Sequence, residues 1–197
     1  MNDSEYMRRA LELAESGVGL TSPNPPVGAV IVKGGEELGV GWHRAAGQPH
    51  AEVEALKDAV ARHGMDAARG ATVYVTLEPC CTQGRTGPCT TALVQAGVRR
   101  VVIGASDPNP AHGGKAAGIL SKGGIEVVEG IEEAGSEELI RAFAKVQRTG
   151  LPWVIIKSAL SLDGRITRTK GEGQWLSGPG SRAEVQDLRG EVDAILS

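Results

Sequence analysis

The chain has 197 residues, of which 41% are hydrophobic and 23% are charged, and its formal net charge is −3. The length allows one domain of about 150 residues with an appendage. Aromatic residues make up only 3% of the chain, and this scarcity, with the mildly acidic charge, disfavours binding along single-stranded nucleic acid. No segment approaches the roughly 18 apolar residues that a membrane span requires. We therefore expect a small-molecule substrate, no nucleic-acid or membrane partner, and a cytoplasmic location.

Helical and extended patterns alternate along the first three quarters of the chain. An amphipathic helix at the N-terminus ends near Gly17, and a continuous apolar run then predicts a β-hairpin that turns at Gly34 and Gly35. Strands are predicted at 27–32, 38–42, 72–77, 100–104 and 125–128. Four further helices are predicted: one that begins near His50, a short one that ends at Gly97, and two that cover 115–121 and 132–147. This order predicts an α/β fold in which helices cover both faces of one sheet, a three-layer α/β/α sandwich.

The alternation begins again at Thr149. Residues 153–159 predict a strand, 178–190 bracket a helix, and 192–196 predict another strand. About 50 residues are too few for an independent core. We therefore expect one domain over residues 1–148, followed by an incomplete second domain over residues 149–197.

Cysteines 80, 81 and 89 lie within ten residues of one another. An odd number cannot form a complete disulfide framework, so metal binding or catalysis is the favoured explanation. Together with His50, the thiolates of Cys80 and Cys89 suit tetrahedral Zn²⁺ and leave the fourth position open, as in a catalytic zinc site. Glu52 follows His50 closely and is placed to transfer protons. Cys81 is expected to be a packed free thiol.

The order His-x-Glu, Pro-Cys and a later Cys is the signature of zinc deaminases, in which activated water attacks an amino-bearing ring carbon. The usual Cys-x-x-Cys spacing is longer here, with eight residues between Cys80 and Cys89. The motifs PNPPVGAV (23–30), GWH (41–43), GQPHAE (47–52), EPCCTQGRTGPC (78–89) and DPNP (107–110) occur in this order. With them, the first 148 residues resemble the deaminase half of the bifunctional riboflavin-biosynthesis deaminase/reductase.

This resemblance implies a cytidine-deaminase-like fold and hydrolytic deamination of 2,5-diamino-6-ribosylamino-4(3H)-pyrimidinone 5′-phosphate to 5-amino-6-(5-phosphoribosylamino)uracil. By motif, Zn²⁺ would be held by His50, Cys80 and Cys89, and Glu52 would be the catalytic acid and base. The substrate would be contacted by Asn24, His43, Ala51, Asp107 and Asn109, with Arg85 near its phosphate. The chain departs from the family at two places. It has Cys80-Cys81-Thr82 where the family usually has Cys-Ser-His, and Gly87 where the family usually has proline.

Residues 149–197 resemble the opening of the same family's NADPH-dependent reductase half. The likeness rests on TGLP (149–152), KSALSLDGR (157–165), QWLS (174–177) and Leu188-Arg189. It implies that Ala159 and Trp175 lie at the dinucleotide and Arg189 at the substrate phosphate. Because the rest of that half is missing, we expect a truncated chain or a natural fragment without reductase activity, so that NADPH is a cofactor only of the full domain.

Two alternatives remain open. A deaminase of cytidine, deoxycytidylate or tRNA would use the same centre, although the long loop between Cys80 and Cys89 and the scarce aromatic residues disfavour it. A non-catalytic, zinc-stabilised binding module would instead close the metal site with a fourth protein ligand such as Cys81. The resemblance to deaminases of this kind also implies self-association, so we expect a homodimer or homotetramer.

Overall fold

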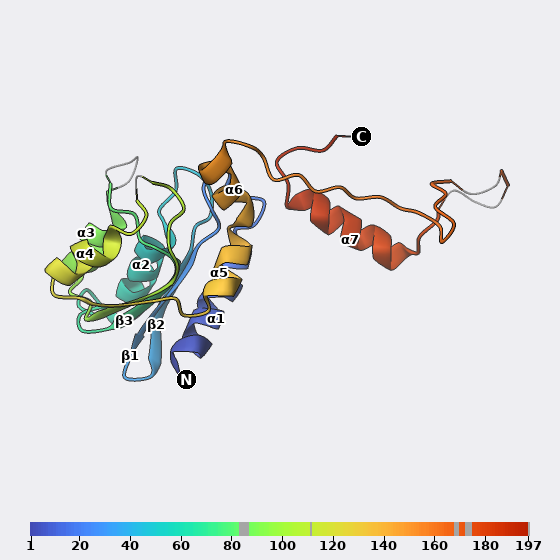
Figure 1. Cartoon of the computed structure of the whole chain (residues 1–197). Coiled ribbons are helices and arrows are strands. Elements are labelled where there is room, and N and C mark those ends of the chain that lie inside the picture. The colour runs from blue at the N-terminus through green and yellow to red at the C-terminus, as the bar shows by residue number, and fades with distance from the viewer. Residues whose placement is uncertain (83–86, 111, 168–169, 172–174, 197) are drawn as a thin grey trace. The chain divides into compact units, whose positions relative to one another are not determined.

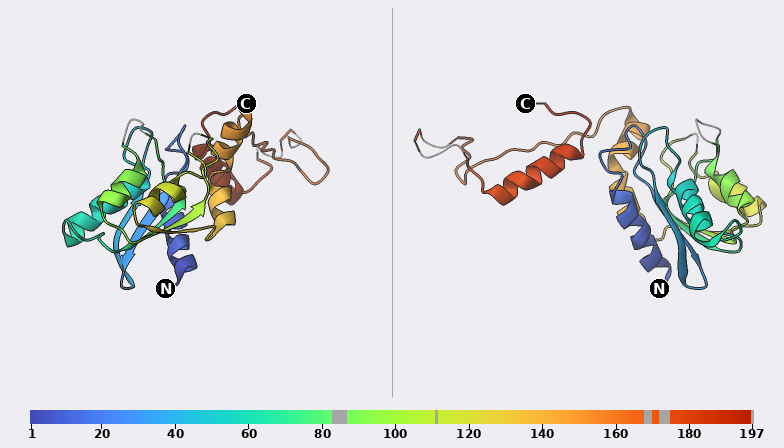
Figure 2. Two further views of the ribbon diagram at one scale, coloured as in Figure 1. Left: turned by 60° about the vertical axis from the view of Figure 1, so that its left-hand side comes forward. Right: turned by 180° about the vertical axis from the view of Figure 1, so that it is seen from behind.

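The computed structural model describes residues 1–82, 87–110, 112–167, 170–171 and 175–196. They form two units, Met1–Pro152 and Trp153–Ser197 (Figure 1). The first unit contains a five-stranded sheet between two layers of helices, which Figure 2 shows from two further directions. No helix among the described residues is long and apolar enough to cross a membrane.

The sheet of the first unit has the strand order β2-β1-β3-β4-β5. Its strands are β1 (Gly28–Lys33), β2 (Glu36–Trp42), β3 (Thr72–Leu77), β4 (Arg100–Ala105) and β5 (Glu126–Glu129). β1 pairs antiparallel with β2 and β3, whereas β3, β4 and β5 are parallel. The carboxyl ends of β3 and β4 therefore lie together, with Leu77 beside Ala105. The loops that leave this edge carry three of the predicted site residues, Cys80, Asp107 and Asn109.

Helices cover both faces of the sheet, as the sequence predicts. One layer contains α1 (Asp3–Glu15), α5 (Glu133–Leu139) and α6 (Arg141–Thr149), and the other contains α2 (Ala51–His63), α3 (Cys89–Gln95) and α4 (Ala116–Lys122) (Figure 1). Met7 of α1 and Val30 of β1 are fully buried in one core, and Ile31 of β1 and Leu93 of α3 in the other. Alternate residues of one strand thus enter opposite cores, which confirms the three-layer α/β/α sandwich.

Two glycines of β2 bring α2 close to the sheet. A Cβ atom built on Gly41 would lie 2.4 Å from the carbonyl oxygen of Ala51 and 2.4 Å from the nitrogen of Ala55. Gly39 is equally restricted, because its Cβ would lie 2.5 Å from the carbonyl oxygen of Ala55. The backbones of strand and helix are therefore in direct contact, and this contact fixes where α2 begins.

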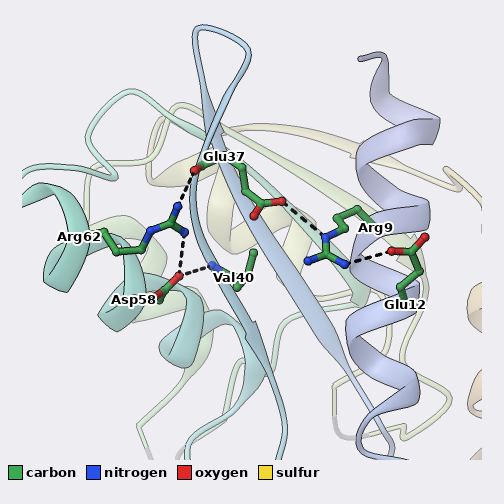
Figure 3. A network of polar contacts seen from close by, with 6 residues as sticks. All are labelled: Arg9, Glu12, Glu37, Val40, Asp58 and Arg62. Atoms are coloured by element: carbon green, nitrogen blue, oxygen red, sulfur yellow. Dashed lines mark hydrogen bonds and ion pairs between the residues drawn. The ribbon is translucent and has the colours of Figure 1, made fainter.

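Polar side chains from both layers meet at the edge strand β2 (Figure 3). Asp58 of α2 accepts a hydrogen bond from the N–H of Val40 (2.9 Å), and Arg62 donates to the carbonyl oxygen of Glu37 (3.5 Å). On the other side, Arg9 of α1 lies 3.7 Å from the carboxylate of Glu37. These bonds satisfy edge groups that no strand pairs, and they strengthen the placement of α2.

A second polar contact joins α1 to β3 and β4. Arg100 donates two hydrogen bonds of 2.8 Å to the two carboxylate oxygens of Asp3, and the Tyr74 hydroxyl donates a third, also of 2.8 Å. The bonds from Arg100 are the main reason why the pKa of Asp3 lies below its ordinary value. Ionised Asp3 therefore stabilises the packing of the first helix on the sheet.

The helix predicted over 132–147 is wrong in one respect, because the structure has two helices there. α5 ends at Leu139, and Ile140 adopts φ −99° and ψ 10° between α5 and α6. These angles lie in the bridge region rather than in the helical one. Ile140 is buried, so the break in the helix accompanies the burial of its side chain.

In the second unit, neither of the strands predicted at 153–159 and 192–196 is formed. A strand needs a neighbour whose N–H and carbonyl groups pair with its own, and the described residues of this unit contain no strand. They form one helix, α7 (Pro179–Gly190), and irregular segments. The apolar pattern of residues 153–159 predicts a strand, but the described residues of this unit provide no neighbouring strand for it to pair with.

Candidate functional site

The three predicted metal ligands come from different elements of the first unit and converge. His50 is the residue before α2, Cys80 follows β3 at the shared carboxyl edge, and Cys89 is the first residue of α3. The Nδ1 atom of His50 lies 3.5 Å from the Sγ atom of Cys80 and 3.3 Å from that of Cys89. All three ligand atoms lie within 4.8 Å of one another.

This arrangement fits a tetrahedral zinc ion. Zinc–sulfur and zinc–nitrogen bonds of ordinary length place nitrogen and sulfur ligands about 3.5 Å apart at a tetrahedral angle, close to the two distances at His50. Within the part of the chain that the structure describes, no fourth His, Cys, Asp or Glu joins this group. One imidazole, two thiolates and room for a further ligand are the donor set of a catalytic zinc site.

The pKa values of Cys80 and Cys89 are shifted in opposite directions by their contact with each other. The thiol of Cys89 donates a hydrogen bond that is the main cause of the lowered pKa of Cys80, about 4. Its backbone N–H also donates to the Cys80 sulfur, at 3.3 Å. The same interaction with Cys80, together with burial, raises the pKa of Cys89. Cys80 is therefore held as the thiolate, the form that binds metal.

Glu52 lies in the first turn of α2, two residues after His50, and is almost completely buried. Burial raises the pKa of its carboxyl group, and interaction with His50 opposes that rise. A buried carboxyl group with a raised pKa, two residues from a candidate metal ligand, suits a group that accepts and donates protons.

His43 and Asn24 form a connected pair beside the cluster. The ring of His43 packs edge-on against that of His50, with centroids 5.2 Å apart. Its Nδ1 lies 3.0 Å from the carbonyl oxygen of Pro49, and its Nε2 lies 3.0 Å from the amide nitrogen of Asn24. Because a carbonyl only accepts, Nδ1 carries the proton and Nε2 accepts from Asn24. Burial, which lowers the pKa of His43, favours this neutral form.

The residues predicted to contact substrate fall into three groups. Asn24 and His43 lie beside His50, and Ala51 is the first residue of α2 and fully buried against Gly41. Asp107 and Asn109 follow β4, so they lie in the loop that leaves the same sheet edge as Cys80. The predicted phosphate ligand Arg85 lies outside the described residues. Direct contact of each residue with substrate stays a prediction.

Glu78 is a site residue for which sequence reasoning assigned no role. It follows β3, is 3% exposed, and accepts hydrogen bonds from the backbone N–H groups of Asp107 (3.1 Å), Gly114 (2.9 Å) and Ala116 (2.9 Å). The sequence contained one sign of such a role, because Glu78 is a charged residue directly after the apolar run that predicts a strand at 72–77. Pattern alone does not reveal that its partners are main-chain groups about 30 residues or more away.

Cys81 lies apart from the cluster. Its sulfur is 3.9 Å from Nδ1 of His112, which also lies 3.4 Å from the Thr82 hydroxyl. Cys81 is a free cysteine, half-buried, and does not belong to the group formed by His50, Cys80 and Cys89. The position next to a ligand therefore does not make it one.

The residues predicted for a reductase lie in the second unit. Ala159 lines a hollow of about 540 Å³ between residues 157–160 and α7. Trp175 and Arg189 are exposed and do not line this hollow, although the Arg182 guanidinium lies 4.9 Å from the centre of the Trp175 ring. The structure does not gather the three predicted residues into one site.

Comparison with known proteins tests the interpretation of this cluster. Residues 1–105 match the family model described as "Cytidine and deoxycytidylate deaminase zinc-binding region". The chain belongs to this family. The cluster of His50, Cys80 and Cys89 lies inside the matched region. Residues 152–197 match a second model, described as "RibD C-terminal domain".

Curated relatives and solved structures agree with both matches. The chain is 49% identical to the riboflavin biosynthesis protein RibD of Escherichia coli over 100% of its length, and 46% identical to that of Haemophilus influenzae over 99%. It spans about half of these relatives, 52% and 51% of their lengths. The structure of Acinetobacter baumannii RibD matches 95% of the chain, and 51% of its own, with a TM-score of 0.86 and 48% identity.

A structure from Thermotoga maritima is named a diaminohydroxyphosphoribosylaminopyrimidine deaminase/5-amino-6-(5-phosphoribosylamino)uracil reductase. It matches 95% of this chain and 52% of its own, with a TM-score of 0.88 and 41% identity. The resemblance to the riboflavin-biosynthesis deaminase/reductase is thereby confirmed, as is the cytidine-deaminase-like fold.

Proposed function

We propose that this chain catalyses the hydrolytic deamination of 2,5-diamino-6-ribosylamino-4(3H)-pyrimidinone 5′-phosphate to 5-amino-6-(5-phosphoribosylamino)uracil. The observation that carries the proposal is the convergence of His50, Cys80 and Cys89 beside the buried carboxyl group of Glu52. Likeness to RibD over the whole chain supports this substrate over other amino-bearing rings.

His50, Cys80 and Cys89 would hold Zn²⁺. When bound, the metal supplies a Lewis acid that makes water a competent nucleophile near neutral pH. Among the described residues the cluster has three members, which favours an open catalytic site over the closed site of a binding module. The contact of Cys81 with His112 rather than with the cluster favours the same interpretation.

Glu52 is proposed to carry protons during the reaction. Its burial holds the carboxyl group close to the metal ligands and raises its pKa, so that it can take a proton from water and deliver it to the ring nitrogen and the leaving amine. Asn24 and the main chain at Ala51 would orient the ring, and Asp107, Asn109 and Arg85 the sugar phosphate. His43 would act through the orientation of Asn24 that its hydrogen bond sets.

Residues 1–148 are proposed as the deaminase domain and 149–197 as the first part of a reductase domain. The match of residues 152–197 to the RibD C-terminal domain supports this division. NADPH binding at Ala159 and Trp175, and phosphate binding at Arg189, would require the residues that the relatives carry beyond the matched half.

The cytoplasm is proposed as the site of the reaction, because thiolate ligands persist in a reducing compartment. A homodimer or homotetramer is proposed as the functional form. Large apolar side chains such as Ile156 and Leu162 are exposed in the second unit, and such surfaces promote self-association.

An ammonia-release assay on the zinc-loaded protein tests the proposed reaction. The pyrimidinone phosphate, cytidine, deoxycytidylate and a tRNA anticodon stem are offered separately, and the first should be turned over fastest. Glu52→Gln should retain zinc and lose at least about a hundredfold in kcat, while Glu54→Gln, on the same turn of α2 but in an ion pair with Lys57, should behave as the wild type. Faster turnover of another substrate, or normal rates in Glu52→Gln, would refute the proposal.

A further inference from the structure

Glu78 is a buried carboxylate for which the proposed reaction has no step. Oxygen Oε2 accepts hydrogen bonds from the N–H groups of Asp107 and Gly114, and Oε1 accepts one from Ala116. Both oxygens of the side chain are thus engaged as acceptors of main-chain N–H groups.

The three N–H donors lie at the two ends of a single loop. Asp107 opens the segment that connects β4 to α4, and Gly114 and Ala116 close it. The side chain of Glu78, the residue after β3, thus joins both ends of the loop between β4 and α4. Removing these acceptors would leave three N–H groups without partners, and the one of Ala116 is buried.

The interior of this loop depends on its first residues. The N–H of Asn109 donates to Oδ1 of Asp107 (2.8 Å), and the N–H groups of His112 and Gly113 both donate to the carbonyl oxygen of Asn109 (2.9 Å each). A Cβ atom on Gly113 would lie 2.5 Å from the carbonyl oxygen of Asp107, so these two residues approach each other closely. The described residues on the two sides of the loop therefore hold one another in place.

The backbone connects Glu78 to β4 on one side and to Cys80 of the candidate metal cluster on the other. Its own N–H donates to the carbonyl oxygen of Ala105 (2.9 Å), and Cys80 follows two residues later. The carbonyl oxygen of Cys80 accepts from the N–H of Thr90 in α3 (3.2 Å). Glu78 therefore stands between a metal ligand and the loop that carries Asp107 and Asn109.

We propose that Glu78 is a positioning residue that holds the loop 107–116 in register with the zinc ligand Cys80, so that Asp107 and Asn109 are preorganised to bind the substrate. The proposal rests on the proposed function, since it takes these two residues as substrate contacts. Glu78 acts on substrate binding rather than on the chemical step. Its loss should therefore appear in KM and not in kcat.

Kinetics of the zinc-loaded full chain test this role. Glu78→Gln keeps the shape but replaces one acceptor oxygen by an amide that only donates, so KM for the pyrimidinone phosphate should rise about tenfold, with kcat within about threefold and zinc content unchanged. Glu78→Asp keeps both oxygens on a shorter stem and should recover part of the loss. Asp58→Asn is the matched control, because Asp58 also accepts a backbone N–H, from Val40 of β2, and its KM should not change.

Amide hydrogen exchange separates this proposal from the proposed function. If the wild type released no ammonia from this compound, the proposed function would fail, and the Kd of the compound would replace KM in the same comparison. In either case the amides of Asp107, Gly114 and Ala116 should exchange faster in Glu78→Gln than in Asp58→Asn. An unchanged KM or Kd, unchanged exchange at these amides, or a fall in kcat with loss of zinc would overturn the positioning role. Glu78→Asp provides the same readouts should Glu78→Gln fail to fold.

Discussion

Two apolar runs of similar character have opposite fates in the two units. Residues 27–32 enter β1, which lies between β2 and β3, and Ile31 is fully buried there. Residues 153–159 begin with the apolar run Trp-Val-Ile-Ile, yet Ile156 is 91% exposed and no strand forms. The difference lies in what surrounds each run, because a strand is stable only when neighbours pair its backbone and cover its side chains.

The same contrast separates the two candidate sites. In the first unit, helices packed on both faces hold His50, Cys80 and Cys89 within one cluster. In the second unit, Ala159, Trp175 and Arg189 share the family's motifs but are not gathered. Both units therefore contain the family's sequence motifs. Among the described residues, the predicted site residues are brought together in the first unit and not in the second.

Equivalent isoleucine truncations should give the largest difference between the units. Ile31→Ala leaves a cavity in a core that is closed on all sides and should lower the free energy of unfolding by about 2 to 5 kcal/mol. Ile156→Ala removes an exposed side chain and should change it by less than about 0.5 kcal/mol. Urea unfolding followed by circular dichroism measures both. Equal effects would mean that residues 153–159 are packed in solution.

Added methyl groups at two glycines should give a smaller contrast. Gly41→Ala forces a Cβ atom against the backbone of α2 and should cost about 1 to 3 kcal/mol of unfolding free energy. Gly180→Ala, in α7, meets no atom within 4 Å and should raise helix content slightly, because alanine favours helix over glycine. Thermal unfolding provides the comparison, and a Gly41→Ala protein as stable as the wild type would contradict the close approach of α2.

Acid titration should give the smallest contrast. The folded-state pKa of Asp3 is lowered, chiefly by the hydrogen bond from Arg100, so its contribution to stability is complete above the ordinary pKa of aspartate and is lost as pH falls through the lowered value. Asp3→Asn should cost about 1 kcal/mol at pH 7, allowing for partial exposure, and progressively less as the pH falls below the ordinary pKa of aspartate.

Asp163→Asn is the matched variant in the second unit. The pKa of Asp163 is also lowered, chiefly by a hydrogen bond from Ser161, but its carboxylate is exposed to solvent. Unfolding of the first unit should not change with this substitution at any pH. A cost for Asp3→Asn that did not decrease as the pH fell below the ordinary pKa of aspartate would show that the ionised carboxylate is not its source.

Much of the fold could be predicted from the sequence because the first unit is locally consistent. Each strand of the sheet is a short apolar run bounded by glycine, proline or a charge, and the helices between them follow the helical period. The break at Ile140 and the missing strands of the second unit could not be predicted this way. They depend on tertiary burial and on the presence of a pairing neighbour, which periodicity does not report.

The cluster of His50, Cys80 and Cys89 could be predicted because three residue types at characteristic positions define the motif. Residues that act through main-chain partners are harder to recognise. Glu78 accepts hydrogen bonds from backbone groups distant in the chain, and His43 uses one ring nitrogen on Pro49 and the other on Asn24. These bonds depend on how the loops fold, which the periodicity of the sequence does not report.

Two adjacent cysteines provide the most direct test of the central claim, that the first unit is a zinc deaminase. Zinc content and ammonia release from the pyrimidinone phosphate are measured on the wild type, Cys80→Ala and Cys81→Ala. The wild type and Cys81→Ala should each bind one zinc ion per cluster and release ammonia, whereas Cys80→Ala should do neither, because only Cys80 faces His50 and Cys89. Full zinc content and activity in Cys80→Ala, or their loss in Cys81→Ala, would contradict the account.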